Sequence, residues 1–402
     1  MAMAWDIPDA LAAASGLRRG DDFWAESARD GVIVRSDSLR KVYVEATGRC
    51  NLRCAMCPRS GWAVESADMS AGCYERLLAG LPEAPPDGIA VAFGGFGEPT
   101  LHPRFLDMVE DARRARCRVE IITNGTTVTP AMAESLASLG VAQVTVSIDG
   151  GDDRAFSAVR GTGLDGILES VGTLRVQARR GVGHMAVGVA SVATRQTVES
   201  LPALIAMARR LKLDFVSITG VVPHTSQLAD DALFEYAAQV SSASPENWRP
   251  RITAGRFDLS PETKPLLDAL FQQSPVVPPP ALDAGTWRNR CRFAREGMLA
   301  VSWDGRVAPC LSLLYTHTEH LGGRDKTVRA FEVGHVGRAA LREIWRDPPF
   351  RALRARLRRF DLSPCLECGG CEISDTNDGD CFGTPFPACS ECLWAQGIVL
   401  CP

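Results

Sequence analysis

The sequence predicts an α/β protein built on a parallel sheet and followed by a small cysteine-rich region. Between residue 41 and about residue 220, strand-like segments alternate with helix-like segments, and nine of the fourteen cysteines lie from Cys291 to Cys401. Strand–helix alternation gives a parallel sheet with right-handed crossovers, either an open doubly wound sheet or a partial barrel. In both architectures the functional site lies at the carboxyl ends of the strands.

The expected strands are rich in β-branched residues, as is typical of strands, and two of them end in glycine. They cover residues 41–47, 88–95, 117–123, 141–149, 184–193 and 213–220. The helices between them follow helical spacing, and the one at 130–140 has Pro at its start and Gly at its end, as helix ends prefer. The expected helices cover residues 70–81, 103–115, 130–140, 164–180 and 198–211.

The remaining segments divide the chain into four parts. Residues 1–40 are a leader without clear periodicity, residues 41–221 form the alternating domain, and residues 222–290 are an irregular insertion or linker that helps to shape a substrate cavity. Residues 291–402 form a small cysteine-rich domain. It opens with a hairpin at 297–310 around Asp304-Gly305, followed by helices at 338–346 and 350–360.

Composition narrows the class of protein. The formal net charge is −4, with no basic excess, so nucleic acid is not expected as the main partner. No apolar run approaches the roughly 18 residues of a membrane span, and the first residues lack the basic and apolar regions of a secretory signal. We therefore expect a cytoplasmic protein without membrane association.

Cysteine usage points to metal. Fourteen cysteines in a chain without an export signal argue against a disulfide framework, because clustered thiols in a reducing compartment usually bind metal. Cys73 and Cys117 stand apart from the clusters, and we expect them to be buried core residues. Cys50, Cys54 and Cys57 directly follow the first strand. Three thiolates can hold one iron–sulfur cube and leave a metal corner open, whereas a zinc knuckle would need a fourth ligand from elsewhere.

The spacing C-x3-C-x2-C after the first strand of a repeating βα chain resembles the signature of the radical S-adenosylmethionine (SAM) superfamily. That resemblance implies a partial (βα)6 barrel, similar to a TIM barrel, in which a [4Fe–4S] cluster held by Cys50, Cys54 and Cys57 binds SAM at its open iron. It also implies reductive cleavage of SAM to a 5′-deoxyadenosyl radical that takes a hydrogen atom from the substrate. The cofactor carries the difficult step, and the protein positions the reactants and excludes water.

The other motifs of the family follow in the expected order, each at a strand end. The segment GGFGEP resembles the GGE element that contacts the methionyl amino group, and Arg160 resembles the arginine that pairs with the SAM carboxylate. Ser147 and Asp149 resemble the polar pair near the ribose and methionyl groups. Met56 stands where the family usually has an aromatic residue, and we expect it to pack near adenine. The implied SAM-binding set is Met56, Gly94, Gly95, Glu98, Asn124, Ser147, Asp149 and Arg160.

The C-terminal cysteines resemble the SPASM extension, which carries auxiliary [4Fe–4S] clusters. Nine thiols can supply one or two four-ligand clusters, and structural zinc sites are the alternative. We expect Cys291, Cys310 and Cys381 to share one cluster and Cys365, Cys368 and Cys371 another, although the spacing of the latter three departs from the extension's usual pattern. The full candidate set is Cys291, Cys310, Cys365, Cys368, Cys371, Cys381, Cys389, Cys392 and Cys401.

The segments FGGFGEPTLHP and CLWAQGIVLCP look like those of SPASM maturases associated with tungsten-dependent aldehyde oxidoreductases. This resemblance implies a partner that is a protein or its pterin-type cofactor, and an electron donor such as ferredoxin or flavodoxin. Alternatives are a peptide-modifying SPASM enzyme, a small-molecule dehydrogenase or epimerase, and a non-catalytic electron carrier. The forty residues before the first strand are too few for a winged-helix peptide-binding domain, and the open triplet argues against an electron carrier. His224 is either a polar substrate contact or a plain loop histidine.

Overall fold

A single large sheet organises the molecule. The computed structural model describes residues 23–28, 31–61, 66–83, 88–181, 183–234, 238–242, 251–258, 260–271, 289–366 and 371–400. Eleven strands form the sheet in the order β15-β12-β11-β3-β4-β5-β6-β7-β8-β10-β9. The six predicted strands are consecutive and parallel in it, which confirms the prediction: β3 (Lys41–Val44), β4 (Ala90–Phe93), β5 (Arg118–Thr123), β6 (Gln143–Ser147), β7 (Ala186–Ala193) and β8 (Phe215–Gly220).

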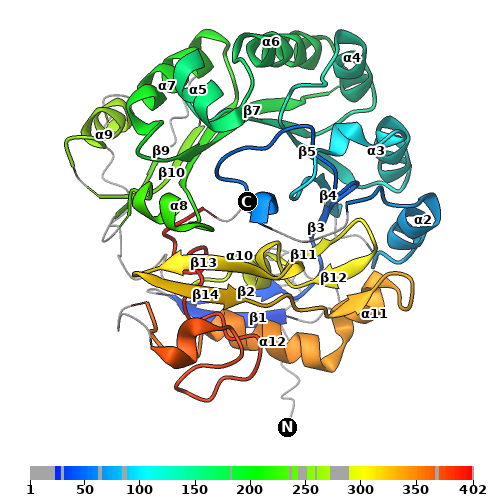
Figure 1. Cartoon of the computed structure of the whole chain (residues 1–402). Helices are drawn as coiled ribbons and strands as arrows, with labels where there is room; N and C mark the ends of the chain where they lie inside the picture. Colours follow the sequence, from blue (N-terminus) through cyan, green and yellow to red (C-terminus); the bar gives the residue numbers. More distant parts are fainter. Residues whose placement is uncertain are drawn as a thin grey trace.

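The sheet curves into a partial barrel with helices on its outer face (Figure 1). It ends in two separate edge strands, β15 and β9, so the barrel stays open. The five predicted helices all form, and a further helix, α5, follows β6. The outer helices are α2 (Ala71–Ala79), α3 (Phe105–Arg114), α4 (Pro130–Ser138), α5 (Asp153–Arg160), α6 (Asp165–Arg180) and α7 (Leu201–Arg210).

Local sequence explains these elements. All four residues of β4 are buried, as expected for a parallel strand covered on both faces. Helix α3 buries Phe105, Met108, Val109 and Ala112, the i, i+3, i+4, i+7 stripe of a helix packed on a core. The side chain of Thr129 caps α4 by accepting a hydrogen bond from the backbone N–H of Met132. The core therefore lies between the sheet and the helical ring.

Two segments expected to lack regular structure contain strands. The stretch 222–290 contributes β9 (Ala238–Ser242) and β10 (Arg251–Phe257) to the main sheet, together with α8 (Ser226–Asp230) and α9 (Lys264–Phe271). Strand β10 pairs parallel with β8, so it extends the barrel instead of linking two domains. The expected leader contains the hairpin of β1 (Phe23–Ala28) and β2 (Gly31–Ser36). Pairing with neighbouring strands stabilises these segments, although their local sequence pattern does not predict strands.

The cysteine-rich region shares the sheet with the barrel. The predicted hairpin forms as β11 (Met298–Val301) and β12 (Arg306–Ala308), and β11 pairs parallel with β3. A separate hairpin joins β13 (His317–Leu321) to β14 (Arg324–Val328) and was not predicted. The other elements are α10 (Arg292–Glu296), β15 (Gly334–His335), α11 (Leu341–Arg346), α12 (Pro348–Arg359) and the short 3-10 turns at Pro58–Gly61, Pro99–Leu101, Val198–Ser200, Ser312–Leu314 and Glu372–Asp375.

Within the ranges that the structure describes, no helix combines the length and the apolar character needed to cross a membrane.

Candidate active site

The loop that carries Cys50, Cys54 and Cys57 leaves the carboxyl end of β3 and lies at the barrel opening (Figure 1). Cys54 is buried, and the other two are half-buried. The backbone N–H of Ala55 donates to the carbonyl of Val159 at 2.9 Å, so the loop is fixed against helix α5. The three thiols are close enough to influence one another electrostatically, as ligands of one cluster must be.

Asn124, at the end of β5, supports this loop from the next strands. Its side-chain amide Nδ2 lies 3.8 Å from Sγ of Cys50 and 3.0 Å from Oδ1 of Asn51. The Asn51 amide in turn donates to Oγ1 of Thr126 at 2.8 Å. An amide that donates to a thiolate favours its charged form, as ligands around a metal centre require.

A buried ion pair borders the thiols. Arg160 Nε donates to Oδ2 of Asp149 at 2.5 Å, and the two side chains are only 11% and 0% exposed. Burial raises the pKa of the Cys54 thiol, and the nearby Arg160 guanidinium opposes that rise. Asp149 also accepts a 2.6 Å hydrogen bond from the N–H of Val192. Strand ends β6 and β7 and helix α5 thus hold one cation beside the cysteines, where an anionic group would be stabilised.

Glu98 is a buried hydrogen-bond centre of the GGFGEP segment. Its Oε1 accepts from the backbone and hydroxyl of Thr100 and from the Thr123 hydroxyl at 2.7 Å. Its Oε2 accepts from the backbone N–H of Asn124 at 2.6 Å. Oε2 accepts one described hydrogen bond whereas Oε1 accepts three, so Oε2 retains more capacity for an ammonium group. Glu98 therefore joins β4 to β5 and can still contact a ligand.

The glycines of this segment are required by close backbone approach. A Cβ on Gly97 would lie 1.7 Å from the carbonyl oxygen of Thr47, which no other residue could accommodate. Gly95 has a φ of +124°, outside the range of L side chains. Gly94 packs on Ile122. Because Gly97 lies on residue 47, the segment holds the start of the cysteine loop in place.

Met56 and Ser147 complete the predicted SAM set. Met56 is buried in a small cluster with Cys54, Val159 and Val221. Ser147 is the last residue of β6 and is half-buried. The carboxyl ends of four parallel strands, β3 to β6, together with the end of helix α5, therefore carry the predicted residues at one edge of the sheet.

A second group of thiols lies in the C-terminal region. Burial raises the pKa of Cys310 well above its ordinary value, and Cys291, Cys389 and Cys392 raise it further by their proximity. Cys291 stands at the N-terminus of α10, whose backbone N–H groups lower its pKa against the effect of burial. Cys389 and Cys392, and not the exposed Cys381, accompany Cys291 and Cys310. This arrangement differs from the grouping expected from the sequence.

The structure describes three of the other five C-terminal cysteines. Cys365 is buried, with its Sγ 2.9 Å from the Ser363 hydroxyl, whereas Cys371 and Cys381 are exposed. Cys368 and Cys401 lie outside the described residues. Cys73 and Cys117 are buried core residues, as predicted.

Comparison with known proteins agrees with this geometry. The radical SAM superfamily matches residues 44–191, and the SPASM iron–sulfur cluster-binding domain matches residues 291–372. The chain is 30% identical over 369 residues to the tungsten-containing aldehyde ferredoxin oxidoreductase cofactor-modifying protein of Pyrococcus furiosus, covering 90% of this chain and 97% of that one. This chain belongs to the radical SAM superfamily.

Other relatives and a solved structure support the assignment of the fold. The mycofactocin maturase MftC of Mycobacterium ulcerans is 28% identical, with 85% of this chain and 82% of MftC covered. The crystal structure of Streptococcus suis SuiB bound to the precursor peptide SuiA matches with a TM-score of 0.55 and 15% identity, covering 86% of this chain and 72% of SuiB. The last similarity shows the fold alone.

As a member of this superfamily, the chain is an enzyme that uses a [4Fe–4S] cluster and SAM, and its SPASM domain binds auxiliary iron–sulfur clusters. The donor set fits these groups. Three thiols with an amide donor and a buried arginine beside them suit a cluster with one open corner, and four mutually close, half-buried thiols suit a fully ligated one. Which thiol binds which cluster is a proposal.

Two side-chain pairings near the strand ends were not found from the sequence, which singled out His224 without its partner. Glu45, directly after β3, is buried and accepts hydrogen bonds from the Tyr315 hydroxyl and, at 3.1 Å, from the N–H of Phe96. His224 lies beside His317 at the junction of β8 and β13, with their ring centroids 5.1 Å apart. An isolated acidic residue after a strand, or a histidine pair separated by ninety-three positions, gives no signal in sequence spacing.

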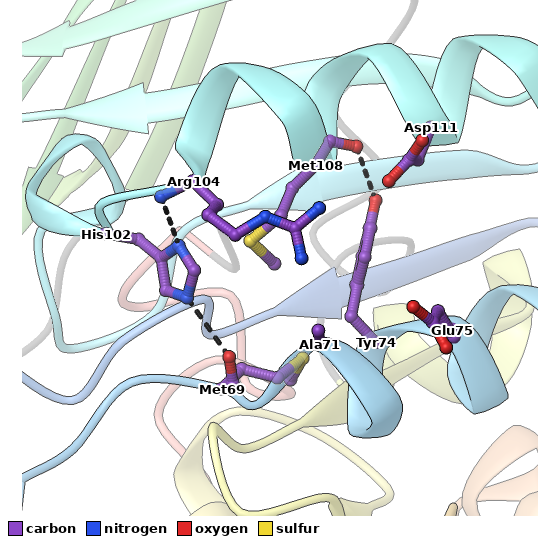
Figure 2. Close-up of a pocket in the computed structure, with 8 residues that line it drawn as sticks. All are labelled: Met69, Ala71, Tyr74, Glu75, His102, Arg104, Met108 and Asp111. Atoms are coloured by element: carbon purple, nitrogen blue, oxygen red, sulfur yellow. Dashed lines mark hydrogen bonds between the residues drawn. The ribbon is translucent and has the colours of Figure 1, made fainter.

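A small cavity of about 20 Å³ lies between α2 and α3, on the outside of the barrel (Figure 2). It can hold about one water molecule, which is too little for a substrate. Figure 2 shows His102 bridging its two sides: Nε2 is 3.0 Å from the Met69 carbonyl, and Nδ1 accepts from the N–H of Arg104 at 3.1 Å. His102, from the segment FGGFGEPTLHP, therefore has a scaffolding role.

Proposed function

We propose that this enzyme takes a hydrogen atom from a protein or from its tungsten–pterin cofactor during maturation of a tungsten-dependent aldehyde oxidoreductase. The observation that supports it best is the similarity to the Pyrococcus furiosus cofactor-modifying protein, which extends over 97% of that relative and includes both domains.

Each residue has a proposed role that the geometry supports. Cys50, Cys54 and Cys57 would hold the cluster, which would supply the one-electron cleavage of bound SAM to a 5′-deoxyadenosyl radical. Glu98 Oε2 would accept a hydrogen bond from the SAM ammonium group, and Arg160, fixed by its ion pair with Asp149, would attract the SAM carboxylate.

The remaining predicted residues shape the pocket around SAM. Met56 supplies an apolar surface for adenine, and Ser147 and Asn124 supply polar groups at the ends of β6 and β5. Gly94 and Gly95 allow the backbone to approach SAM closely. Packing of the pocket between strand ends excludes water, which protects a reactive radical.

The auxiliary clusters define the second part of the proposal. Cys291, Cys310, Cys389 and Cys392 are proposed as the ligands of one cluster, because these half-buried thiols lie close enough to raise one another's pKa. Cys365, Cys368, Cys371, Cys381 and Cys401 are the candidates for any further one. A ferredoxin or flavodoxin is the proposed electron donor, and the cytoplasm is the proposed location.

The test uses oxygen-protected, reconstituted protein with dithionite and SAM. We expect roughly eight to twelve irons per chain, as two or three cubanes require, and release of 5′-deoxyadenosine. Replacing Cys50, Cys54 and Cys57 by Ala should abolish that release and remove roughly four irons. The matched controls are Cys73→Ala and Cys117→Ala, which change buried cysteines outside the sites. Release that persists in the triple variant would refute the assignment.

The substrate is tested by adding a tungsten-dependent aldehyde oxidoreductase encoded near this gene. We expect 5′-deoxyadenosine formation to rise above the substrate-free level. Similarity to MftC favours a peptide as the second candidate, so the same assay is run with a short precursor peptide from neighbouring genes. Stimulation by the peptide alone would replace the tungsten enzyme as the proposed substrate.

A further inference from the structure

His224 lies in the loop that follows β8, at the same end of the barrel as the proposed SAM site. Three residues earlier, Val221 belongs to the same apolar cluster as Met56 and Cys54. The loop is fixed from the other side by the β13 hairpin, because the N–H of His320 donates to the carbonyl of Pro223 at 2.7 Å. The carboxyl ends of parallel barrel strands are where substrates bind, so the loop faces the reaction site.

The hydrogen bond of His224 defines its tautomer. Its Nδ1 lies 3.2 Å from the carbonyl oxygen of Thr318. A carbonyl can only accept, so Nδ1 carries the hydrogen and Nε2 presents a lone pair. The side chain is half-buried, which leaves room for a contact.

His317 and Glu319 stand behind this ring. His317 Nδ1 lies 2.9 Å from the Tyr315 carbonyl, and Nε2 lies 3.3 Å from Oε1 of Glu319. The Tyr315 carbonyl can only accept, so Nδ1 of His317 carries a hydrogen. The contact between Nε2 and Glu319 then needs one further proton, which lies either on His317 or on the Glu319 carboxyl group. The two side chains are only 3% and 11% exposed, and the ring of His317 meets that of His224 edge to face.

The charges around His224 keep it neutral. Burial, followed by the proximity of His317, lowers the pKa of His224 to about 4. His320 acts in the same direction and Glu319 opposes it, while Lys326 faces Glu319 on its other side. At neutral pH the Nε2 lone pair is therefore available.

A scaffolding histidine in the same chain looks different. His102 uses both ring nitrogens for backbone partners, at Met69 and Arg104. The hydrogen bond described for His224 involves Nδ1. The loop that carries the ring lies at the substrate-binding edge of the barrel. A ring fixed by one nitrogen and charged neighbours that hold it neutral together suit a ligand contact.

We propose that Nε2 of His224 accepts a hydrogen bond from an O–H or N–H group of the substrate, and that His317 and Glu319 are positioning residues for it. The inference rests on the proposed function for its substrate. It restricts that substrate to a molecule with a hydroxyl, amine or amide hydrogen near the reacting carbon.

The first test is chemical labelling of the anaerobic holoenzyme with diethyl pyrocarbonate, which attacks unprotonated imidazole nitrogen. The control is a histidine-containing model peptide in the same reaction. A free histidine with the ordinary pKa of about 6.5 loses roughly 25-fold in neutral fraction between pH 7 and pH 5, so the labelling rate of the peptide should fall by that factor. Labelling of His224, followed by mass spectrometry, should change less than about 1.5-fold. An unlabelled His224, or one whose labelling falls as the peptide's does, overturns the proposal.

The second test addresses the positioning residues. His317→Gln keeps an N–H for the Tyr315 carbonyl and removes the ring whose proximity lowers the pKa of His224. We expect the His224 labelling rate at pH 5 to drop, because the pKa of His224 rises. An unchanged pH profile in His317→Gln rejects the positioning role.

The third test uses the tungsten-dependent aldehyde oxidoreductase as the substrate probe. His224→Leu should raise the KM for that protein about tenfold, the value of one lost hydrogen bond, while His224→Gln, which keeps an acceptor oxygen, should restore it. Equal KM values in His224→Leu and wild type overturn the proposal. If the tungsten enzyme does not raise 5′-deoxyadenosine formation by the wild type, the proposed substrate is wrong. The labelling experiments then decide the proposal for His224.

Discussion

Glu45 shows how a single residue connects the barrel to the cysteine-rich region. Its carboxyl group is buried, and burial raises its pKa, while hydrogen bonds from Tyr315 and the Phe96 N–H lower it. Tyr315 comes from the C-terminal region and also packs against Phe96, with ring centroids 6.0 Å apart. The same carboxyl therefore depends on residues from both parts of the chain.

Replacing Tyr315 by Phe should destabilise the protein in a pH-dependent way. The variant leaves a buried acceptor unpaired, at a cost of about 1–3 kcal/mol. The pKa of Glu45 is raised by folding, so its protonated form is favoured in the native state and stability is lost as pH rises above about 4.5. Since Tyr315→Phe raises that pKa further, the loss relative to wild type should grow between pH 4.5 and 8 in urea unfolding.

The matched control is Tyr74→Phe, because the Tyr74 hydroxyl donates to the backbone carbonyl of Met108 at 2.7 Å, a group that does not titrate. Its loss of stability should be the same across this pH range. Parallel pH profiles for the two variants would contradict the role given to Glu45.

At the scale of elements, the turn after β4 supports the cysteine loop after β3. Gly97 lies against residue 47, and the N–H of Glu98 donates to the carbonyl of Arg49 at 2.8 Å. Arg49 is itself paired with Asp68 at 2.7 Å, just before α2. The geometry of the cluster site is therefore set by three neighbouring segments.

Gly97→Ala should displace the cysteine loop, because its Cβ cannot occupy the space held by the Thr47 carbonyl. We expect a loss of about four irons per chain and of 5′-deoxyadenosine release, with the auxiliary irons retained. Gly172→Ala, in α6, is the control: nothing lies within 4 Å of its added Cβ. That substitution should leave iron unchanged and stabilise the helix by about 0.5–1 kcal/mol. Full iron content in Gly97→Ala would show that the turn does not position the loop.

At the scale of the whole molecule, the two sequence domains share one sheet. Strand β11 supplies the neighbour of β3, and β12 and β15 continue the sheet beyond it. Asp37, before β3, also pairs with Arg354 and Arg358 of α12. The boundary at residue 291 is therefore not a structural division.

A chain that ends at residue 290 should fail to fold. It exposes the edge of β3 and leaves Glu45 without Tyr315, and an unpaired apolar edge strand promotes aggregation. We expect it in the insoluble fraction, whereas the full chain expressed alongside is soluble and binds iron. A soluble fragment with about four irons that releases 5′-deoxyadenosine would show that the barrel is independent.

The sequence by itself determined the parallel α/β core, because its period and turn residues act locally at each strand and helix. It also predicted the cysteine triplet and the positions proposed to bind SAM, since they follow successive strand ends that any parallel sheet brings together. Only the tertiary structure decided the pairing of β10 and β11 with the barrel, the joining of Cys389 and Cys392 to Cys291 and Cys310, and the contacts of Glu45 and His224. These depend on residues up to 270 positions apart, whose proximity comes from packing of the whole chain and leaves no trace in local spacing.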